Sequence, residues 1–575
     1  MKLFTNFLEI ALIFLLFALY GAYAVPDTNE AHYLGKAAHF WNPNYVQSDF
    51  FLDSPDAHGV FYWTFGWLTL FLPMNAVAWI GRILTWAGLA GGWVWMVRPF
   101  FSRFGLALLS AGLFLFLSQN CSFAGEWVVG GVEAKGFAFV LIFFALGAVI
   151  RNRWNTALIL LGFAAMFHVL VGGWCLVALG IAWLILKDYE PSLKKSGTSE
   201  DLAKCFLPTF YSILPGLILA GLLTLPALLP ALQLNQNVSP EVAQNATKLY
   251  VYERLPHHLL LSFVAQKTPQ KLLHFGILLL IWHFLIARPR YSNGEMTFRT
   301  FIYASLLIGL CGWGINLFMN AAPDLTASLL RYYWFRTVDV MIPLGAAILC
   351  VEYATHPVTI PTEKTAEKSE ETPERKLTKE ERKALRRENR SIERMMNRRR
   401  KFLVVLLIAL VSFQVWESSQ RFAKPMKPRS CSGAACGQSW IDLCQFIQEN
   451  TEPTDVFVVP YTVRTFHWFA RRPSVGVWKD VPQDSQGIWD WWVRMQDQFY
   501  GFDPSNPTQQ YGRVASFTLM PRQKIQYLAN EYGAKYLVRN KNDLKNRQVI
   551  LDVPNGIQDF ELVYENKDFE LRRLQ

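Results

Sequence analysis

The most informative stretch of the chain follows its first apolar segment. It reads Val25-Pro26-Asp27-Thr28-Asn29-Glu30-Ala31-His32-Tyr33-Leu34-Gly35-Lys36 and continues at Ser48-Asp49-Phe50-Phe51-Leu52-Asp53-Ser54-Pro55-Asp56-Ala57-His58. Residues 25–58 hold five carboxylates and three histidines against one lysine, and both flanks are apolar enough to be membrane helices. An acidic loop pinned to a membrane surface is poorly suited to anionic lipid heads. It suits a general base, or a metal ion, held over a substrate that the bilayer delivers.

The composition predicts a polytopic membrane protein. Of 575 residues, 52% are hydrophobic, 15% are aromatic and only 18% are charged. The net charge of +11 is concentrated in one region, because residues 363–401 contain 15 Lys or Arg against 9 Glu. A basic loop of this kind is expected on the cytoplasmic side of the membrane. Nucleic acid is therefore not expected as a partner.

Apolar runs long enough to span, or nearly span, a membrane recur along the chain. They lie near 7–24, 58–80, 83–97, 104–118, 136–150, 155–186, 206–232, 272–287, 300–319, 329–352 and 402–419. The fold class predicted is mainly α, a bundle of about 10–11 transmembrane helices. The first run could instead be a cleaved signal peptide, but a retained anchor is preferred because the acidic loop begins directly after it. The run at 155–186 is interpreted as a hairpin that turns near His168.

The basic loops predict the orientation, which is that of a multi-pass protein of the cytoplasmic (inner) membrane. Positive charge is expected in the cytoplasm at Arg151 and Arg153 and in the segments 187–204, 288–299 and 363–401. The loops 25–57, 233–270 and 320–330 and everything after 420 then fall on the outer face. Two spans between 58 and 97 would place Arg98 and Arg103 outside and break this alternation. A re-entrant or interfacial helix there would restore it.

The predicted domains are a membrane domain over 1–354, a charged cytoplasmic and partly helical loop over 355–401, a last span at 402–420 and a periplasmic α/β domain over 430–575. Within the last domain, Ser439 to Asp442 opens an amphipathic helix with a capping-box-like start. Residues 455–459, 535–538 and 561–564 read as strands, and 485–500 and 522–533 read as helices.

The first outer loop resembles that of GT-C glycosyltransferases, polytopic enzymes that take sugars from polyprenyl-phosphate donors. The local match is with protein O-mannosyltransferases, whose loop carries Asp-Glu-x-His-Phe-Gly-Lys and later Phe-Asp-x-His. Here Asn29-Glu30-Ala31-His32-Tyr33-Leu34-Gly35-Lys36 and Asp56-Ala57-His58 are similar to those elements. Asn29 replaces the family aspartate, one residue is inserted before the glycine, and the later Pro-Pro is missing. The base implied by this resemblance is therefore Glu30 or Asp27.

The whole layout also resembles a group of uncharacterised bacterial integral-membrane proteins. They share the acidic first loop, a Trp-Phe-Arg-x-x-Asp helix and a characteristic C-terminal segment. The matching parts here are Trp334-Phe335-Arg336-Thr337-Val338-Asp339 and the segment from Glu449 to Lys479.

The resemblance to glycosyltransferases implies a role for each candidate residue. Inverting transfer needs a carboxylate to deprotonate the acceptor, and cations or a metal ion for the charge on the leaving phosphate. Glu30 or Asp27 would be the base. The substrate-binding candidates are His32, Asp56, His58, Arg254, His257, Arg331 and Arg336. Asp53 and Asp56 could hold a divalent cation, Mg²⁺ or Mn²⁺. The partners implied are the lipid bilayer, a polyprenyl-phosphate sugar donor and an unknown acceptor.

Each assignment has a structural alternative. The first-loop carboxylates could simply solvate an exposed loop, and Arg336 could pair with Asp339 three residues along its helix. Glu126, Glu133 and Lys135 could line a cavity, but surface charges on an interfacial helix are preferred. For the whole chain, the alternatives are a transporter or lipid-carrier flippase, and a non-catalytic scaffold whose outer domain binds a partner.

Overall fold

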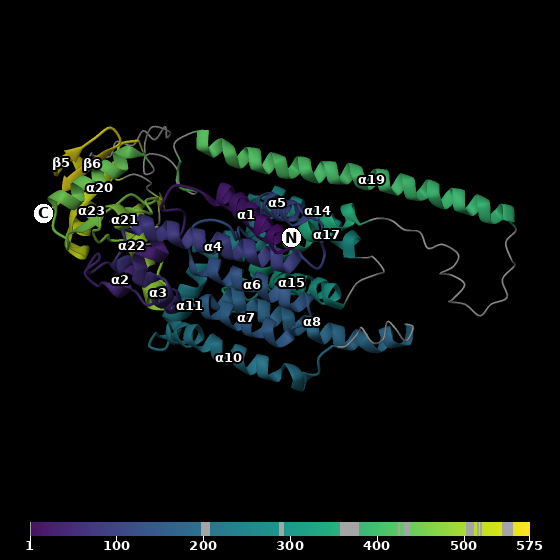
Figure 1. The fold of residues 1–575 in the computed structure, drawn as a ribbon. Helices are drawn as coiled ribbons and strands as arrows, with labels where there is room; N and C mark the ends of the chain where they lie inside the picture. The colour runs from purple at the N-terminus through teal and green to yellow at the C-terminus, as the bar shows by residue number, and fades with distance from the viewer. Residues whose placement is uncertain are drawn as a thin grey trace.

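The computed structural model is a helical bundle with a small α/β domain at one end (Figure 1). It describes residues 2–196, 207–286, 293–356, 379–423, 426–429, 437–501, 511–513, 517, 520–542 and 556–575. Within these residues, six helices are long and apolar enough to cross a membrane. They are α1 (Lys2–Gly21), α8 (Val169–Ser196), α10 (Phe210–Gln233), α15 (Asn293–Leu317), α17 (Arg336–Thr355) and α19 (Lys379–Gln420). The predicted polytopic helical fold with a C-terminal α/β domain is confirmed.

Other bundle helices are shorter or carry a charge. The shorter apolar ones are α5 (Leu106–Cys121), α6 (Ala134–Ile150), α7 (Trp154–Phe167) and α14 (Pro269–Ile286). The 24-residue helix α4 (Met74–Val97) contains the fully buried Arg82. Helices α7 and α8 meet at His168, where the sequence predicted a turn. Helix α1 packs into the bundle through Ile13 and Phe17, both 0% exposed.

The predicted division into runs at 58–80 and 83–97 is wrong, because two short helices are followed by one long helix. Residues 59–70 form the short helices α3 (Gly59–Thr64) and η1 (Gly66–Leu70), which leave Trp63 and Phe71 63% and 73% exposed. Pro73 then begins α4, which is a single helix. Because one helix, not two, runs the length of the bundle here, Arg98 and Arg103 lie at its far end from the first loop.

Contacts between distant loops support this common end. The Phe100 ring packs on Phe298 with centroids 5.4 Å apart. Next to Phe298, Arg299 pairs with Glu352 near the end of α17 at 3.2 Å. The backbone of Gly294 also lies directly against Ile150, the last residue of α6. The described ends of the helices that flank the basic segments therefore gather at the end of the bundle opposite the C-terminal domain (Figure 1).

Helix α19 joins the predicted charged loop to the last predicted span. It is one continuous helix of 42 residues, and its N-terminal part extends beyond the bundle (Figure 1). Residues 379–401 are therefore helical, while the rest of that loop, 357–378, lies outside the described residues.

Short helices cap the end of the bundle that carries the acidic loop. They are α2 (Glu30–Trp41), α11 (Pro240–Lys248), the π-helical turn η2 (Leu249–Arg254), α12 (Pro256–Leu259), α13 (Leu261–Lys267) and α16 (Pro323–Leu330). The sequence Ser239-Pro240 explains one of these starts. The Ser239 hydroxyl accepts the Val242 amide, and proline is preorganised for the first helical position.

The C-terminal domain is built on a four-stranded sheet of order β1-β4-β6-β5. The strands are β1 (Val456–Val458), β4 (Ala534–Asn540), β5 (Glu561–Glu565) and β6 (Phe569–Arg573). Strand β1 pairs with β4 in parallel, and the other pairs are antiparallel. Helices α20 (Gln438–Asn450), α21 (Phe466–Phe469), α22 (Ser485–Phe499) and α23 (Arg522–Tyr532) complete the domain, with the small β2–β3 ribbon (Tyr500–Gly501 and Tyr511–Arg513).

Most predicted elements of this domain are confirmed, with two differences. Strand β6 was not predicted, and it lies in the middle of the sheet. The capping box is wrong, because α20 begins after Gly437 without a side-chain cap, and Asp442 accepts a hydrogen bond from Gln438 instead.

Candidate functional site

The acidic first loop lies between the bundle and the C-terminal domain (Figure 1). The Tyr45 hydroxyl donates to the His467 carbonyl at 2.9 Å. The Arg494 guanidinium lies 4.1 Å from the centre of the Phe50 ring. The loop is thus covered by a folded domain, and the alternative of an exposed, solvated loop is not what the structure has.

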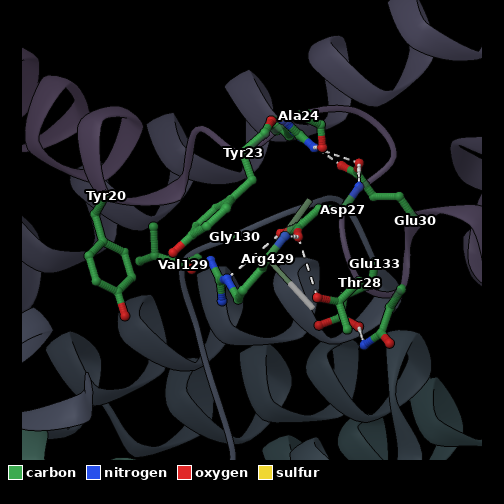
Figure 2. Close-up of polar contacts among 12 residues, drawn as sticks. Tyr20, Tyr23, Ala24, Asp27, Thr28, Glu30, Val129, Gly130, Glu133 and Arg429 are labelled. Carbon is green, nitrogen blue, oxygen red and sulfur yellow. Dashed lines mark hydrogen bonds and ion pairs between the residues drawn. The ribbon is translucent and has the colours of Figure 1, made fainter. Parts of the chain in front are cut away.

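Glu30 is fully enclosed by hydrogen-bond donors. Its side chain is 0% exposed, and Arg82 Nε and Nη2 donate to its two oxygens, each at 2.6 Å. The Val132 amide donates to Oε1 at 2.8 Å, and the Asp27 amide donates to Oε2 at 2.7 Å (Figure 2). Gly131 makes this packing fit, since a Cβ there would come within 2.8 Å of Glu30. These contacts favour an anchoring role for Glu30 over proton transfer to a substrate.

Asp27 is held by the linker to the C-terminal domain. Its Oδ1 accepts the backbone amide of Arg429 at 2.9 Å, and its Oδ2 lies 3.9 Å from Arg429 Nε (Figure 2). The Arg429 guanidinium also donates to the Val129 carbonyl at 3.1 Å and stacks near Tyr23 and Trp127. Both predicted bases therefore belong to one buried cluster of alternating charges.

The outer turn between α5 and α6 carries a second buried network. The Asn29 amide donates to Glu133 at 2.7 Å, and Glu133 pairs with Lys135 at 3.1 Å. Lys135 also contacts Glu126 at 3.3 Å, and Glu126 pairs with Arg336 at 2.6 Å. The exposures of the Glu126, Glu133 and Lys135 side chains are 3%, 2% and 9%. Their interpretation as surface charges is therefore wrong.

The alternative based on helical spacing proposed that Arg336 pairs with Asp339. The structure does not have this pair. Asp339 instead accepts the Ser122 hydroxyl at 2.6 Å and the Phe123 and Glu126 amides at 2.7 and 3.0 Å. It thereby fixes the turn that carries Glu126. This arrangement leaves Arg336 to Glu126 and to His168, whose Nε2 lies 3.3 Å from Arg336 Nη1.

Asp56 and His58 form a pair that the C-terminal domain holds. Asp56 Oδ1 lies 2.9 Å from His58 Nδ1, and Gln483 Nε2 lies 3.1 Å from Asp56 Oδ2. Burial alone would raise the pKa of Asp56, but His58 and Lys36 outweigh it and hold this pKa below its ordinary value. His58 Nε2 faces the Tyr33 hydroxyl at 3.4 Å, and its ring centroid is 5.6 Å from that of His168.

The other predicted metal ligand, Asp53, faces a different partner. Asp53 pairs with His39 at 2.7 Å and is 49% exposed, whereas the Asp56 side chain is 6% exposed and turned to His58. Among the described residues, no group of three or more His, Cys, Asp or Glu is placed to hold a metal ion. The prediction of a divalent cation gains no geometric support from these two aspartates.

A chain of histidines and aspartates joins the first loop to the domain. His467 lies between Asp49 at 2.7 Å and Asp480 at 3.7 Å, and the predicted residue His32 lies 3.7 Å from Asp480. Burial lowers the pKa of His467, but Asp49 and Asp480 outweigh it, so this pKa is raised above its ordinary value. These contacts between imidazoles and carboxylates hold the first loop to the C-terminal domain.

The remaining predicted cations lie in two places. Arg254 donates to the backbone carbonyls of Trp478 and Lys479 at 3.0 and 3.3 Å, with His257 nearby in α12. Arg331 instead donates to the Thr247 hydroxyl at 3.1 Å. Lys479 was not predicted as a site residue, because no short-range pattern marks a lysine whose neighbours come from another domain.

The structure thus brings most predicted residues to one end of the bundle. Asp27 and Glu30 share one cluster, which Asn29 links to the network of Glu133 and Arg336. Asp56 and His58 reach that network through His168, and His32 and Arg254 contact the C-terminal domain. Of the predicted set, Arg331 and Asp53 have separate partners.

The fold and the site define a multi-pass helical membrane protein whose C-terminal α/β domain covers an acidic loop. A family model described as a domain of unknown function (DUF6798) matches residues 438–498, which include most of the contacts to that loop. No curated protein matches the chain.

Two solved structures are similar. One is the archaeal oligosaccharyltransferase AglB from Archaeoglobus fulgidus in complex with an inhibitory peptide and a dolichol-phosphate. It is 11% identical, with a TM-score of 0.41, covering 95% of this chain and 70% of that one. The other is an Archaeoglobus fulgidus oligosaccharyltransferase in complex with Zn and sulfate. It is 10% identical, with a TM-score of 0.38, covering 94% and 68%. At such values the function has to be argued from the site.

Proposed function

We propose that the protein is a GT-C-like membrane glycosyltransferase. It would move a sugar from a polyprenyl-phosphate donor to an acceptor on the outer face of the cytoplasmic membrane. The observation that carries this proposal is the meeting of the first-loop carboxylates and histidines with the cations of three other segments. They meet at the end of the bundle opposite the basic loops, around Arg336, Arg254 and Lys479.

The chemistry of transfer fits this mixture of groups. The acceptor oxygen forms a bond to the anomeric carbon while the bond from that carbon to the donor phosphate breaks. The acceptor proton needs a base, and the departing phosphate needs cations to offset its charge. A site that excludes water strengthens both effects.

Within this proposal the Asp56–His58 pair is the better base. Glu30 and Asp27 are committed to Arg82 and Arg429. His58 is 14% exposed on its side chain, and Asp56 is placed to orient its ring. Glu30 and Asp27 then keep the loop in place, and His32 holds the loop to the domain.

The first experiment uses a deletion strain and the purified protein in liposomes. Loss of the gene should change the polyprenyl-phosphate sugars or the surface glycans seen by mass spectrometry. The liposomes should transfer sugar from a polyprenyl-phosphate donor. His58→Gln should lower turnover by about 10²–10⁴-fold.

His39→Gln is the matched control, since His39 is a first-loop histidine paired with an exposed aspartate. It should keep turnover within about threefold of the wild type, well below the loss expected of a base. Unchanged glycans together with no transfer by the wild-type protein would contradict the proposal. A flippase or a scaffold would then explain the fold better.

A further inference from the structure

The junction between η2 and the C-terminal domain is unusually rich in positive charge. Arg254 is 7% exposed and uses two N–H groups on the carbonyls of residues 478 and 479. Its guanidinium lies 5.4 Å from the Trp478 ring. That ring stacks on Tyr461 at 5.1 Å and packs on Trp491 at 5.0 Å, so the segment is firmly held.

Lys479 is the cation without a counter-charge of its own. Within the described residues its ammonium group makes no hydrogen bond or ion pair, and the side chain is partly buried. The neighbouring cations are Arg254 and Arg464. The carboxylates that favour its charged form are Asp480 and Glu133, and each has other partners.

Asp480 and Glu133 both contact side chains other than Lys479. Asp480 lies between His32 and His467, and Glu133 accepts from Asn29 and pairs with Lys135. These two carboxylates are therefore engaged elsewhere, and neither forms an ion pair with Lys479.

The pKa values of Lys479 and His257 show the effect of the neighbouring cations. Burial, Arg254 and Arg464 lower the pKa of Lys479 to about 7, although Asp480 and Glu133 oppose them. Burial and the cations Arg254 and Lys479 lower the pKa of His257 to about 4, so its ring is neutral at physiological pH. An anion bound beside Lys479 would favour the charged form of the lysine and raise its pKa.

We propose that Arg254 and Lys479, with Arg464 beside them, bind a phosphate group at the junction between the membrane bundle and the C-terminal domain. That this phosphate belongs to the lipid-linked donor rests on the proposed function. Arg254 comes from the bundle and Lys479 from the domain, so the bound phosphate is shared between them. The C-terminal domain thereby completes the donor site.

Binding takes up a proton. Without ligand, Lys479 is partly neutral near pH 7, and a bound phosphate favours its charged form. Affinity should therefore be highest below pH 7 and should fall as the pH rises above it, by up to about tenfold per pH unit. Lys479→Arg would remove this dependence, because a guanidinium stays charged.

The test measures binding rather than transfer. Full-length protein in nanodiscs is titrated with sugar-free polyprenyl phosphate, and in a second arm with inorganic phosphate, while Trp478 and its neighbours report through tryptophan fluorescence. The wild type should bind the lipid phosphate about tenfold or more weakly at pH 8.5 than at pH 6.5. Lys479→Met should bind at least about tenfold more weakly at pH 6.5. Lys479→Arg should not weaken as the pH rises, because the guanidinium stays charged while the phosphate only gains negative charge over this range.

Lys535→Met is the matched control, because Lys535 is a lysine of the same domain that is 51% exposed and pairs with Asp455. It should bind like the wild type. Unchanged affinity in Lys479→Met, or pH-independent binding by the wild type, overturns the site. If gel filtration shows Lys479→Met only as aggregate, the comparison of Lys479→Arg with the wild type tests the site instead. The site is overturned if the affinity of Lys479→Arg falls with rising pH as the affinity of the wild type does.

The two proposals fail in different ways. Binding with the expected pH dependence but without sugar transfer leaves the phosphate site standing and removes the glycosyltransferase. Inorganic phosphate that binds as tightly as the lipid phosphate overturns the assignment to a lipid-linked donor. Absence of binding in both arms overturns the phosphate site itself.

Discussion

Replacing Glu30 with glutamine should destabilise the protein rather than only slow a reaction. Four donors point at the carboxylate: two N–H groups of Arg82 and the amides of Val132 and Asp27. A glutamine can present one oxygen to two of these donors. Its NH₂ group then faces the other two donors, and the charge that balances Arg82 is gone.

The size of the effect follows from these contacts. Two hydrogen bonds to the ionised carboxylate are lost, and both are charge-assisted, at about 1.5–3 kcal/mol each. Arg82 is 0% exposed and keeps the carbonyl of Tyr23 and that of Ala24 as partners, but its charge stays buried without a counter-charge. Breaking a buried ion pair by removing one partner costs about 3–5 kcal/mol, and we expect Glu30→Gln to fall in this range.

The assay is the thermal unfolding of detergent-purified protein, followed by fluorescence-detected gel filtration. Glu30→Gln should lower the transition by several degrees. The double variant Glu30→Gln with Arg82→Met should recover part of the loss, because it removes the unpaired cation. Asp53→Asn is the control, since Asp53 is half-exposed and should leave the transition unchanged. A Glu30→Gln protein as stable as the wild type but unable to transfer sugar would refute the anchoring role and restore Glu30 as the base.

Further expectations concern the linker, the domain contact and the topology. Arg429→Ala should free the linker from the first loop, so limited proteolysis should cut near it faster than in the wild type, at unchanged helical content by circular dichroism. The raised pKa of His467 means that its pairing with Asp49 contributes stability in full below the unfolded pKa, and that this contribution is lost as the pH rises through the folded pKa. Alkaline pH should therefore weaken the domain contact in hydrogen exchange, and His467→Gln should remove this pH dependence. Reporter fusions at positions 390 and 500 should report opposite compartments, and the same compartment for both would exclude an outer-face site.

Local patterns in the sequence predicted the bundle well. The length and apolar content of each run are properties of the run itself, so α5, α6, α10, α14 and α17 appear where they were expected. The error at 58–97 has a local cause that hydropathy does not register. Pro73 and Gly66 interrupt an apolar stretch, so exposed aromatic side chains such as Trp63 belong to short helices and do not continue the long helix α4.

The site was predictable in composition but not in its pairings. The acidic loop is dense enough to single out Glu30 and Asp56, yet their partners Arg82 and Gln483 lie 52 and 427 positions away. Glu126 was read as a surface charge because Arg336, its partner, comes from a different helix. Sequence spacing reports neighbours along one element, whereas these contacts depend on how elements pack.

The long helix α19 has a mechanical consequence. Its 42 residues measure about 63 Å, roughly twice the thickness of the hydrocarbon core. About half of it therefore stands clear of the bundle as a rigid arm. The C-terminal end of α19 is followed within a few residues by Arg429, whose backbone amide donates to Asp27 at the start of the first loop. Because one continuous helix joins this arm to the linker that carries Arg429, the position of the arm and that of the first loop are mechanically connected.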